Sequence, residues 1–76
     1  LDAIADKALR EEFERNFILQ ATRERALSVK ELARELEVPP YEILEQVVAL
    51  RSKNLIAMEP IVGITPRYKA IVAGGG

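Results

Sequence analysis

The sequence predicts a mainly helical domain with one small β-hairpin, that is, an α+β fold. Three observations carry this prediction. Residues 2–25 contain neither glycine nor proline and have the composition of a long helix. Residues 29–37 and 40–53 have the composition of two shorter helices, with Val38-Pro39-Pro40 between them. Residues 55–72 then become apolar and rich in strand formers, with Val62-Gly63 as a candidate turn.

Length and composition limit the class of protein. A chain of 76 residues makes one small domain, and the absence of cysteine and histidine excludes disulfides, thiolate metal sites and the commonest general base. No apolar run is long enough to cross a bilayer and no signal peptide is evident, so we expect a cytoplasmic protein. The chain opens on Leu1 and closes on Gly74-Gly75-Gly76, which indicates a piece of a longer protein.

The first helix is expected over residues 2–25. Asp2 and Asp6 lie early and Arg23 and Arg25 lie late, as the helix dipole favours. A four-residue spacing predicts one buried stripe along it, made of Leu9, Phe13, Phe17 and Ala21. Residues 1–11 are expected to be a helical extension or linker, residues 12–72 the domain, and residues 73–76 a flexible tail.

The second and third helices are expected to follow at once. Ser28 is a good N-cap, and Glu31 three residues later completes a capping box. Pro40 suits the first turn of the third helix, where its missing N–H is not needed. Asn54 is a plausible left-handed C-cap. The inward faces are expected to consist of Leu32, Ala33, Leu36, Ile43, Val47 and Leu50.

Two strands are expected to close the fold. Leu55–Ile61 is apolar and rich in strand formers, and Ile64–Val72 is a second such run after the Val62-Gly63 turn. Pro66 places the second strand at a sheet edge or a bulge.

This order of elements resembles the winged helix-turn-helix superfamily, including the MarR-like and ArsR-like regulators. The matching residues are Leu27-Ser28-Val29, Glu31-Leu32-Ala33, Leu36 and Val38, then Ile43, Val47, Leu50 and Asn54-Leu55-Ile56. The resemblance covers residues 12–72 and implies three helices plus a wing of two or three strands. It also implies that the third helix is the recognition helix of a DNA-binding relative.

Two residues depart from the family pattern. Glu37 occupies a turn position often held by glycine, where a left-handed backbone would cost about 1 kcal/mol. Pro39 replaces the usual serine-like cap of the third helix.

The outward face of the third helix departs further. Tyr41, Leu44 and Val48 lie at i, i+3 and i+7, on a different side from the inward stripe. Glu42 and Glu45 flank them and would repel phosphate. An exposed apolar patch usually marks a partner site, so these five residues are the candidate protein interface. The competing interpretation is that Leu44 and Val48 pack beneath the long first helix.

The wing offers the mildly basic residues. Arg67 and Lys69 share one strand face, and Arg51 and Lys53 end the third helix nearby. These four cations are the candidate phosphate contacts. The competing interpretation is that they are ordinary solvated charges.

No catalytic constellation is evident in the sequence. The hydroxyl residues lack a histidine to activate them, and Glu11, Glu12 and Glu14 point in different directions, so a shared metal site is not expected. We therefore expect no enzyme activity, cofactor, metal or small-molecule ligand, and no membrane partner. The leading hypothesis is an interaction module of a larger protein that docks on a protein partner or on a neighbouring subunit or domain through its third helix. The alternative is a DNA-binding regulator with residues 40–53 in the major groove and its wing on phosphates. A third possibility is dimerisation through the N-terminal helix.

Overall fold

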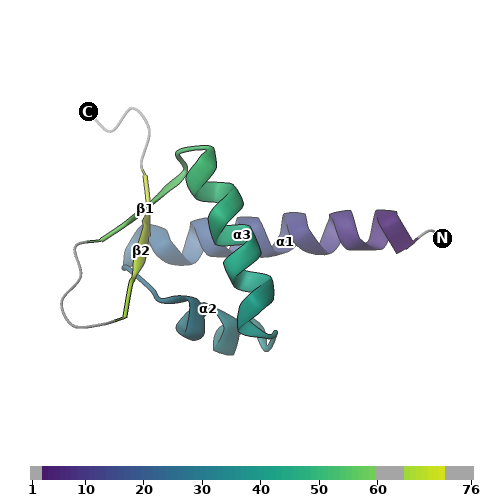
Figure 1. Cartoon of the computed structure of the whole chain (residues 1–76), viewed down its shortest axis with the longest axis horizontal. Helices are drawn as coiled ribbons and strands as arrows, with labels where there is room; N and C mark the ends of the chain where they lie inside the picture. The colour runs from purple at the N-terminus through teal and green to yellow at the C-terminus, as the bar shows by residue number, and fades with distance from the viewer. Residues whose placement is uncertain (1–2, 60–64, 72–76) are drawn as a thin grey trace.

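A computed structural model describes residues 3–59 and 65–71 of the chain. In this part of the chain three helices precede a two-stranded antiparallel sheet (Figure 1). The elements in chain order are α1 (Ala3–Glu24), α2 (Val29–Leu36), α3 (Pro40–Ser52), β1 (Ile56–Met58) and β2 (Tyr68–Ala70). The mainly helical fold class with a small hairpin is confirmed.

The connection from α2 to α3 forms as its residues dictate. Ser28 caps α2: its Oγ accepts from the Glu31 N–H at 3.1 Å, and its own N–H donates to Glu31 Oε1 at 2.9 Å. Glu37 ends the helix in the left-handed region at φ 57°. Pro39 then takes the N-cap position without a side-chain cap, and Pro40 opens α3. The left-handed backbone of Glu37 and the absence of a side-chain cap at Pro39 both agree with the sequence analysis.

The core lies where the three helices and the sheet meet. The inward residues of α3 are buried as expected, and so are Leu32 and Ala33 of α2, while Leu36 is half-buried. Ile18 of α1, Ile56 of β1 and Tyr68 of β2 complete the centre. Because the apolar residues of α3 recur at spacings of four and three, one side of that helix faces the core.

The buried stripe predicted along α1 is wrong in its first half. Leu9 is 67% exposed and Phe13 is 61% exposed, whereas Phe17 and Ala21 only border the core. The buried line instead runs through Glu14, Ile18 and Thr22, at the same spacing of four. The side chains of residues 6–10 are all exposed, and Figure 1 shows the first turns of α1 projecting beyond the other elements.

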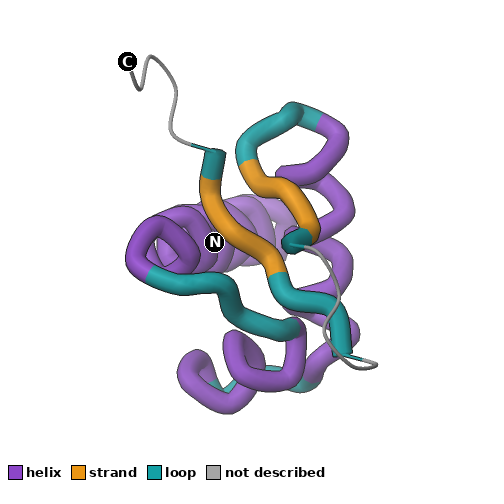
Figure 2. The backbone as a smooth tube through the Cα atoms, turned by 90° about the vertical axis from the view of Figure 1, so that its left-hand side faces the viewer, coloured by secondary structure: helices purple, strands orange, loops and turns teal. Residues whose placement is uncertain are grey.

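The sheet is shorter than the two predicted runs. Ile56 pairs with Ala70 and Met58 pairs with Tyr68, while Pro66 precedes β2 and lies outside it. Leu27 adds a single bridge to Tyr68, with N–H···O distances of 3.0 and 2.8 Å. Figure 2 shows the two strands side by side in front of α1, which is seen end-on. The predicted Val62-Gly63 turn lies outside the described residues.

The predicted division of the chain stays a prediction. α1 is one continuous helix across residue 11. The glycine tail at 73–76 lies outside the described residues. Among the residues that are described, no helix is long and apolar enough to span a membrane.

Candidate functional site

The outward face of α3 carries three exposed apolar side chains. Tyr41 is 64% exposed, Leu44 is 49% exposed and Val48 is 60% exposed. Leu44 and Val48 therefore do not pack beneath α1, and that interpretation is wrong. We call Tyr41, Leu44 and Val48 the α3 patch. Because Ile43, Val47 and Leu50 occupy the core, the rotation of α3 is fixed and the patch must face outward.

The two glutamates beside the patch differ in their surroundings. Glu45 is exposed, while Glu42 is only partly exposed because it lies against α1. No basic residue occurs in α3 before Arg51. The first three turns of α3 thus present apolar and anionic groups.

A chain of polar side chains joins α1 to α3. Arg15 Nη1 donates to Gln46 Oε1 at 2.9 Å, and Gln46 Nε2 donates to Glu11 Oε2 at 3.5 Å. Gln46 is buried, and these bonds satisfy its amide at the crossing of the two helices. The middle of α3 therefore crosses α1 near Glu11 and Arg15.

Glu14 is the unusual member of this crossing. Only 3% of its surface is exposed, and its Oε2 has no hydrogen-bond partner among the described residues. Its neighbour across the interface is the carboxyl of Glu42. Two carboxylates cannot satisfy one another unless they share a proton. Burial, and after it the Glu42 carboxyl, raises the pKa of Glu14 from 4.5 to about 7.

A pocket of about 220 Å³ opens over this carboxyl pair. Its acidic lining consists of Glu11, Glu14, Glu42 and Glu45. Lys7, Arg10, Tyr41 and Gln46 complete the wall. A second hollow adjoins this pocket, and its apolar side is formed by Leu44, Val48 and Ala49. The two share Lys7, Glu11, Glu45 and Gln46.

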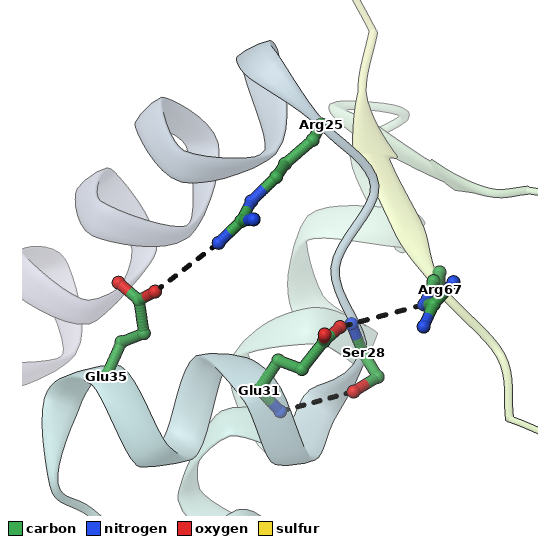
Figure 3. A network of polar contacts seen from close by, with 5 residues as sticks. All are labelled: Arg25, Ser28, Glu31, Glu35 and Arg67. Atoms are coloured by element: carbon green, nitrogen blue, oxygen red, sulfur yellow. Dashed lines mark hydrogen bonds and ion pairs between the residues drawn. The ribbon is translucent and has the colours of Figure 1, made fainter.

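The four cations proposed for phosphate differ in their surroundings. Arg67 Nε lies 3.7 Å from Glu31 Oε1, in the network that also holds Ser28 (Figure 3). Arg51 lies over the Tyr68 ring, with 5.9 Å from its Cζ to the ring centroid. Lys53 is exposed, and Lys69 is half-buried.

The backbone of the sheet places the end of α3 and Arg67 at different ends of β2. Ile71 N–H donates to Leu55 O at 2.9 Å, so the end of α3 lies beside the end of β2. Arg67 precedes the start of β2 and therefore lies at the opposite end of the strand. Two of the four cations contact other side chains of the domain. That the four contact phosphate together stays a prediction.

Sequence reasoning missed Glu14 and Gln46. The signal for Glu14 was its spacing of four from Ile18 and of eight from Thr22, which puts it on their face of the helix. A glutamate interrupts an apolar stripe, so the apolar pattern of the sequence favoured Leu9 and Phe13 for the buried face. In the described residues, no three acidic side chains are placed to hold a metal ion.

Comparison with known proteins shows the fold. No protein-family model and no curated protein matches this sequence. The solved structure of reduced HlyU from Vibrio cholerae N16961 matches 91% of this chain and 74% of its own, at 24% identity and a TM-score of 0.71. Rv0081 of M. tuberculosis matches 92% of this chain and 75% of its own, at 20% identity and a TM-score of 0.67.

The chain therefore has a winged helix-turn-helix fold, as the resemblance implied. α2 and α3 are its helix-turn-helix and the hairpin of β1 and β2 is its wing. At these identities the likeness defines the fold and leaves the function to be argued from the surface.

Proposed function

We propose that this chain is a winged-helix binding domain that docks on a polypeptide through α3. The observation that carries the proposal is the α3 patch, because three large apolar side chains are exposed at the position of a recognition helix. Contiguous apolar surface on a soluble domain usually marks a contact site. Tyrosine and aliphatic groups are also typical anchors of protein interfaces.

The acidic residues favour polypeptide over nucleic acid. Glu42 and Glu45 flank the patch, and Glu11 and Glu14 lie next to them across the pocket. Phosphate neutralisation supplies most non-specific DNA affinity, so carboxylates on the outward face of α3 oppose DNA binding. A net charge of −1 adds no long-range attraction for DNA.

DNA binding is the second candidate, and the fold likeness favours it. The sequence resembles MarR-like and ArsR-like regulators, and the two solved structures support the same fold. In that case residues 40–53 would lie in the major groove and Arg67 and Lys69 would contact phosphates. The local chemistry weighs against this candidate because no basic residue occurs in α3 before Arg51.

Site-specific photo-crosslinking tests the docking proposal. A photoreactive residue at Val48 should capture a discrete polypeptide in extracts of the source cells, whereas the same residue at exposed Arg34 of α2 should not. Excess unlabelled chain should compete with capture, and Leu44→Asp should abolish it. Because Leu44 is half exposed, this variant should remain folded, which circular dichroism would verify. Equal adducts from both positions would refute docking through α3.

A further inference from the structure

The acidic pocket between α1 and α3 contains a buried carboxyl oxygen that has no hydrogen-bond partner among the described residues. Glu14 is buried, and its Oε2 accepts no hydrogen bond from the described residues. Such a group is costly unless a proton or a cation accompanies it. The ion pairs of the described residues are Arg25–Glu35 and Arg67–Glu31, and neither reaches the pocket.

We propose that this pocket accepts an arginine side chain of the polypeptide that docks on α3. The inference rests on the proposed function and names the chemistry of the partner. Four carboxyl groups line the pocket against two cations, Lys7 and Arg10, so a further positive charge fits its electrostatics. A water occupies about 30 Å³ in the liquid, so 220 Å³ accommodates a guanidinium head.

The shape of the lining favours arginine over lysine. Guanidinium is a planar fork that pairs with two carboxylate oxygens at once, and it also stacks on aromatic rings. The pocket offers both partners, because the Glu14 and Glu42 carboxyls lie beside each other and Tyr41 forms part of the wall. An ammonium would gain charge pairing without the planar match.

The pocket also continues into the apolar part of the docking face. Glu45 and Gln46 belong both to the pocket and to the adjoining hollow, whose far side contains Leu44 and Val48. A single segment of the partner can therefore place an apolar side chain against the α3 patch and an arginine in the pocket. The α3 patch supplies affinity, and the acidic pocket supplies specificity.

Arginine binding should release the proton that the carboxyl pair holds. With a pKa of about 7, Glu14 is about one-tenth ionised at pH 6 and about nine-tenths ionised at pH 8. The proton belongs to the pair formed with Glu42. The other titratable groups around it are Lys7, Arg10, Glu11, Tyr41 and Glu45, with Arg15 bound to Gln46.

The test is an NMR titration of the 76-residue chain with N-acetyl-arginine amide. We expect shifts of the Glu14 and Glu42 carboxyl carbons and of Tyr41, with an affinity that rises about tenfold from pH 6 to pH 8. The neutral control, citrulline amide with its α-amine acetylated, should bind at least fivefold more weakly than the arginine probe. Lysine amide with its α-amine acetylated should also bind at least fivefold more weakly. Equal binding of citrulline would overturn the proposal, and equal binding of lysine would overturn the choice of arginine.

Matched variants tie the result to the pocket. Glu14→Gln should weaken the arginine probe at least fivefold at pH 8 and remove the pH dependence. Glu12→Gln makes the same charge change at an exposed position outside the pocket and should change neither. Glu42→Gln provides the same test should Glu14→Gln fail to fold. Unaltered binding in these pocket variants contradicts the proposal.

The probe titration separates this inference from the docking proposal. The small probe needs the pocket and does not need Leu44 or Val48. If the probe fails to bind while Val48 still captures a polypeptide, the pocket assignment falls and docking through α3 stands. If the probe binds and capture fails, the pocket is a guanidinium site and the docking proposal falls.

Discussion

Glu31 of α2 lies between the helix cap and the wing, with its Oε1 3.7 Å from Arg67 Nε. The same oxygen accepts from the Ser28 N–H at 2.9 Å. The backbone hydrogen bond with Ser28, ahead of the charge of Arg67, lowers the pKa of Glu31. One carboxylate thus closes the capping box and joins the start of β2 to the start of α2.

Removing Glu31 should cost more than removing Arg67. Glu31→Ala loses the reciprocal cap and should lower the free energy of unfolding by about 1 kcal/mol. Arg67→Ala loses only an exposed ion pair and should cost less than about 0.5 kcal/mol. Urea unfolding at pH 7 measures both. Because the folded pKa of Glu31 is lowered, its contribution is present above the unfolded pKa and is lost as pH falls through the folded one. An equal cost for the two variants would contradict this assignment.

The Glu14 carboxyl should make the domain less stable as pH rises. Its folded pKa of about 7 lies above the unfolded value of 4.5, so between these values the unfolded chain loses its proton first. Stability from this group therefore declines from about pH 4.5 to pH 7, by at most about 3 kcal/mol. Urea unfolding across that range, compared with Glu14→Gln, isolates the effect.

The Glu14→Gln variant gives the sharper half of this prediction. It should be more stable than the wild type at pH 8, and the difference should shrink toward pH 4. The side-chain carbon of Glu14, followed by NMR, should titrate near pH 7. The prediction would be contradicted if Glu14 titrated at its ordinary pKa and the wild type and the variant had the same free energy of unfolding at every pH. The carboxyl pair would then not destabilise the fold.

The first half of α1 should tolerate polar substitution. Leu9 and Phe13 are exposed, so Leu9→Gln and Phe13→Gln should change the unfolding free energy by less than about 0.5 kcal/mol. Ile18→Ala removes a fully buried side chain and should cost about 2–4 kcal/mol. Urea unfolding of dilute samples measures the free energy of unfolding of all three variants. A large loss of stability in Phe13→Gln would show that Phe13 is buried, as the sequence predicts.

DNA binding should be weak. Non-specific DNA binders have Kd values of about 10⁻⁴–10⁻⁶ M at physiological salt. We expect fluorescence anisotropy with a labelled duplex to show no saturation up to about 100 µM protein, even at low salt. If the duplex does bind, Arg67→Glu should weaken binding. The dependence of the binding constant on salt concentration would then give the number of phosphates that the protein contacts. That outcome would favour the regulator hypothesis over docking.

Relief of the strained turn should stabilise the domain. Glu37 holds φ 57°, a region that costs residues with a Cβ about 1 kcal/mol. Glu37→Gly should raise stability by about 0.5 kcal/mol, because glycine also increases the entropy of the unfolded chain. Asn54 holds φ 60° and already tolerates that region, so Asn54→Gly should be close to neutral. Thermal unfolding compares the two.

Local signals in the sequence were enough for most of the fold. The Ser28–Glu31 box, the Pro39-Pro40 break and the inward residues of α3 each depend on neighbours a few positions away, and each is confirmed. The strands proved shorter than their apolar runs, because pairing depends on the partner strand as well as on composition.

The face of α1 and the carboxyl pair were beyond sequence reasoning. Apolar residues occur on several sides of α1, so its pattern does not select one face, and the crossing with α3 and β2 decides it. Glu14 and Glu42 are 28 positions apart, and nothing local predicts that they meet. The exposure of Tyr41, Leu44 and Val48 was foreseeable only because the opposite side of α3 was already assigned to the core.

The placement of the tyrosines gives the domain two independent optical reporters. The chain contains two tyrosines and no tryptophan. Tyr68 is buried at 8% exposure beneath Arg51, so its near-ultraviolet dichroism will follow unfolding. Tyr41 stands in the solvent, where acrylamide quenches it until a bound molecule shields the ring. A single unlabelled sample can therefore distinguish loss of structure from occupancy of the surface.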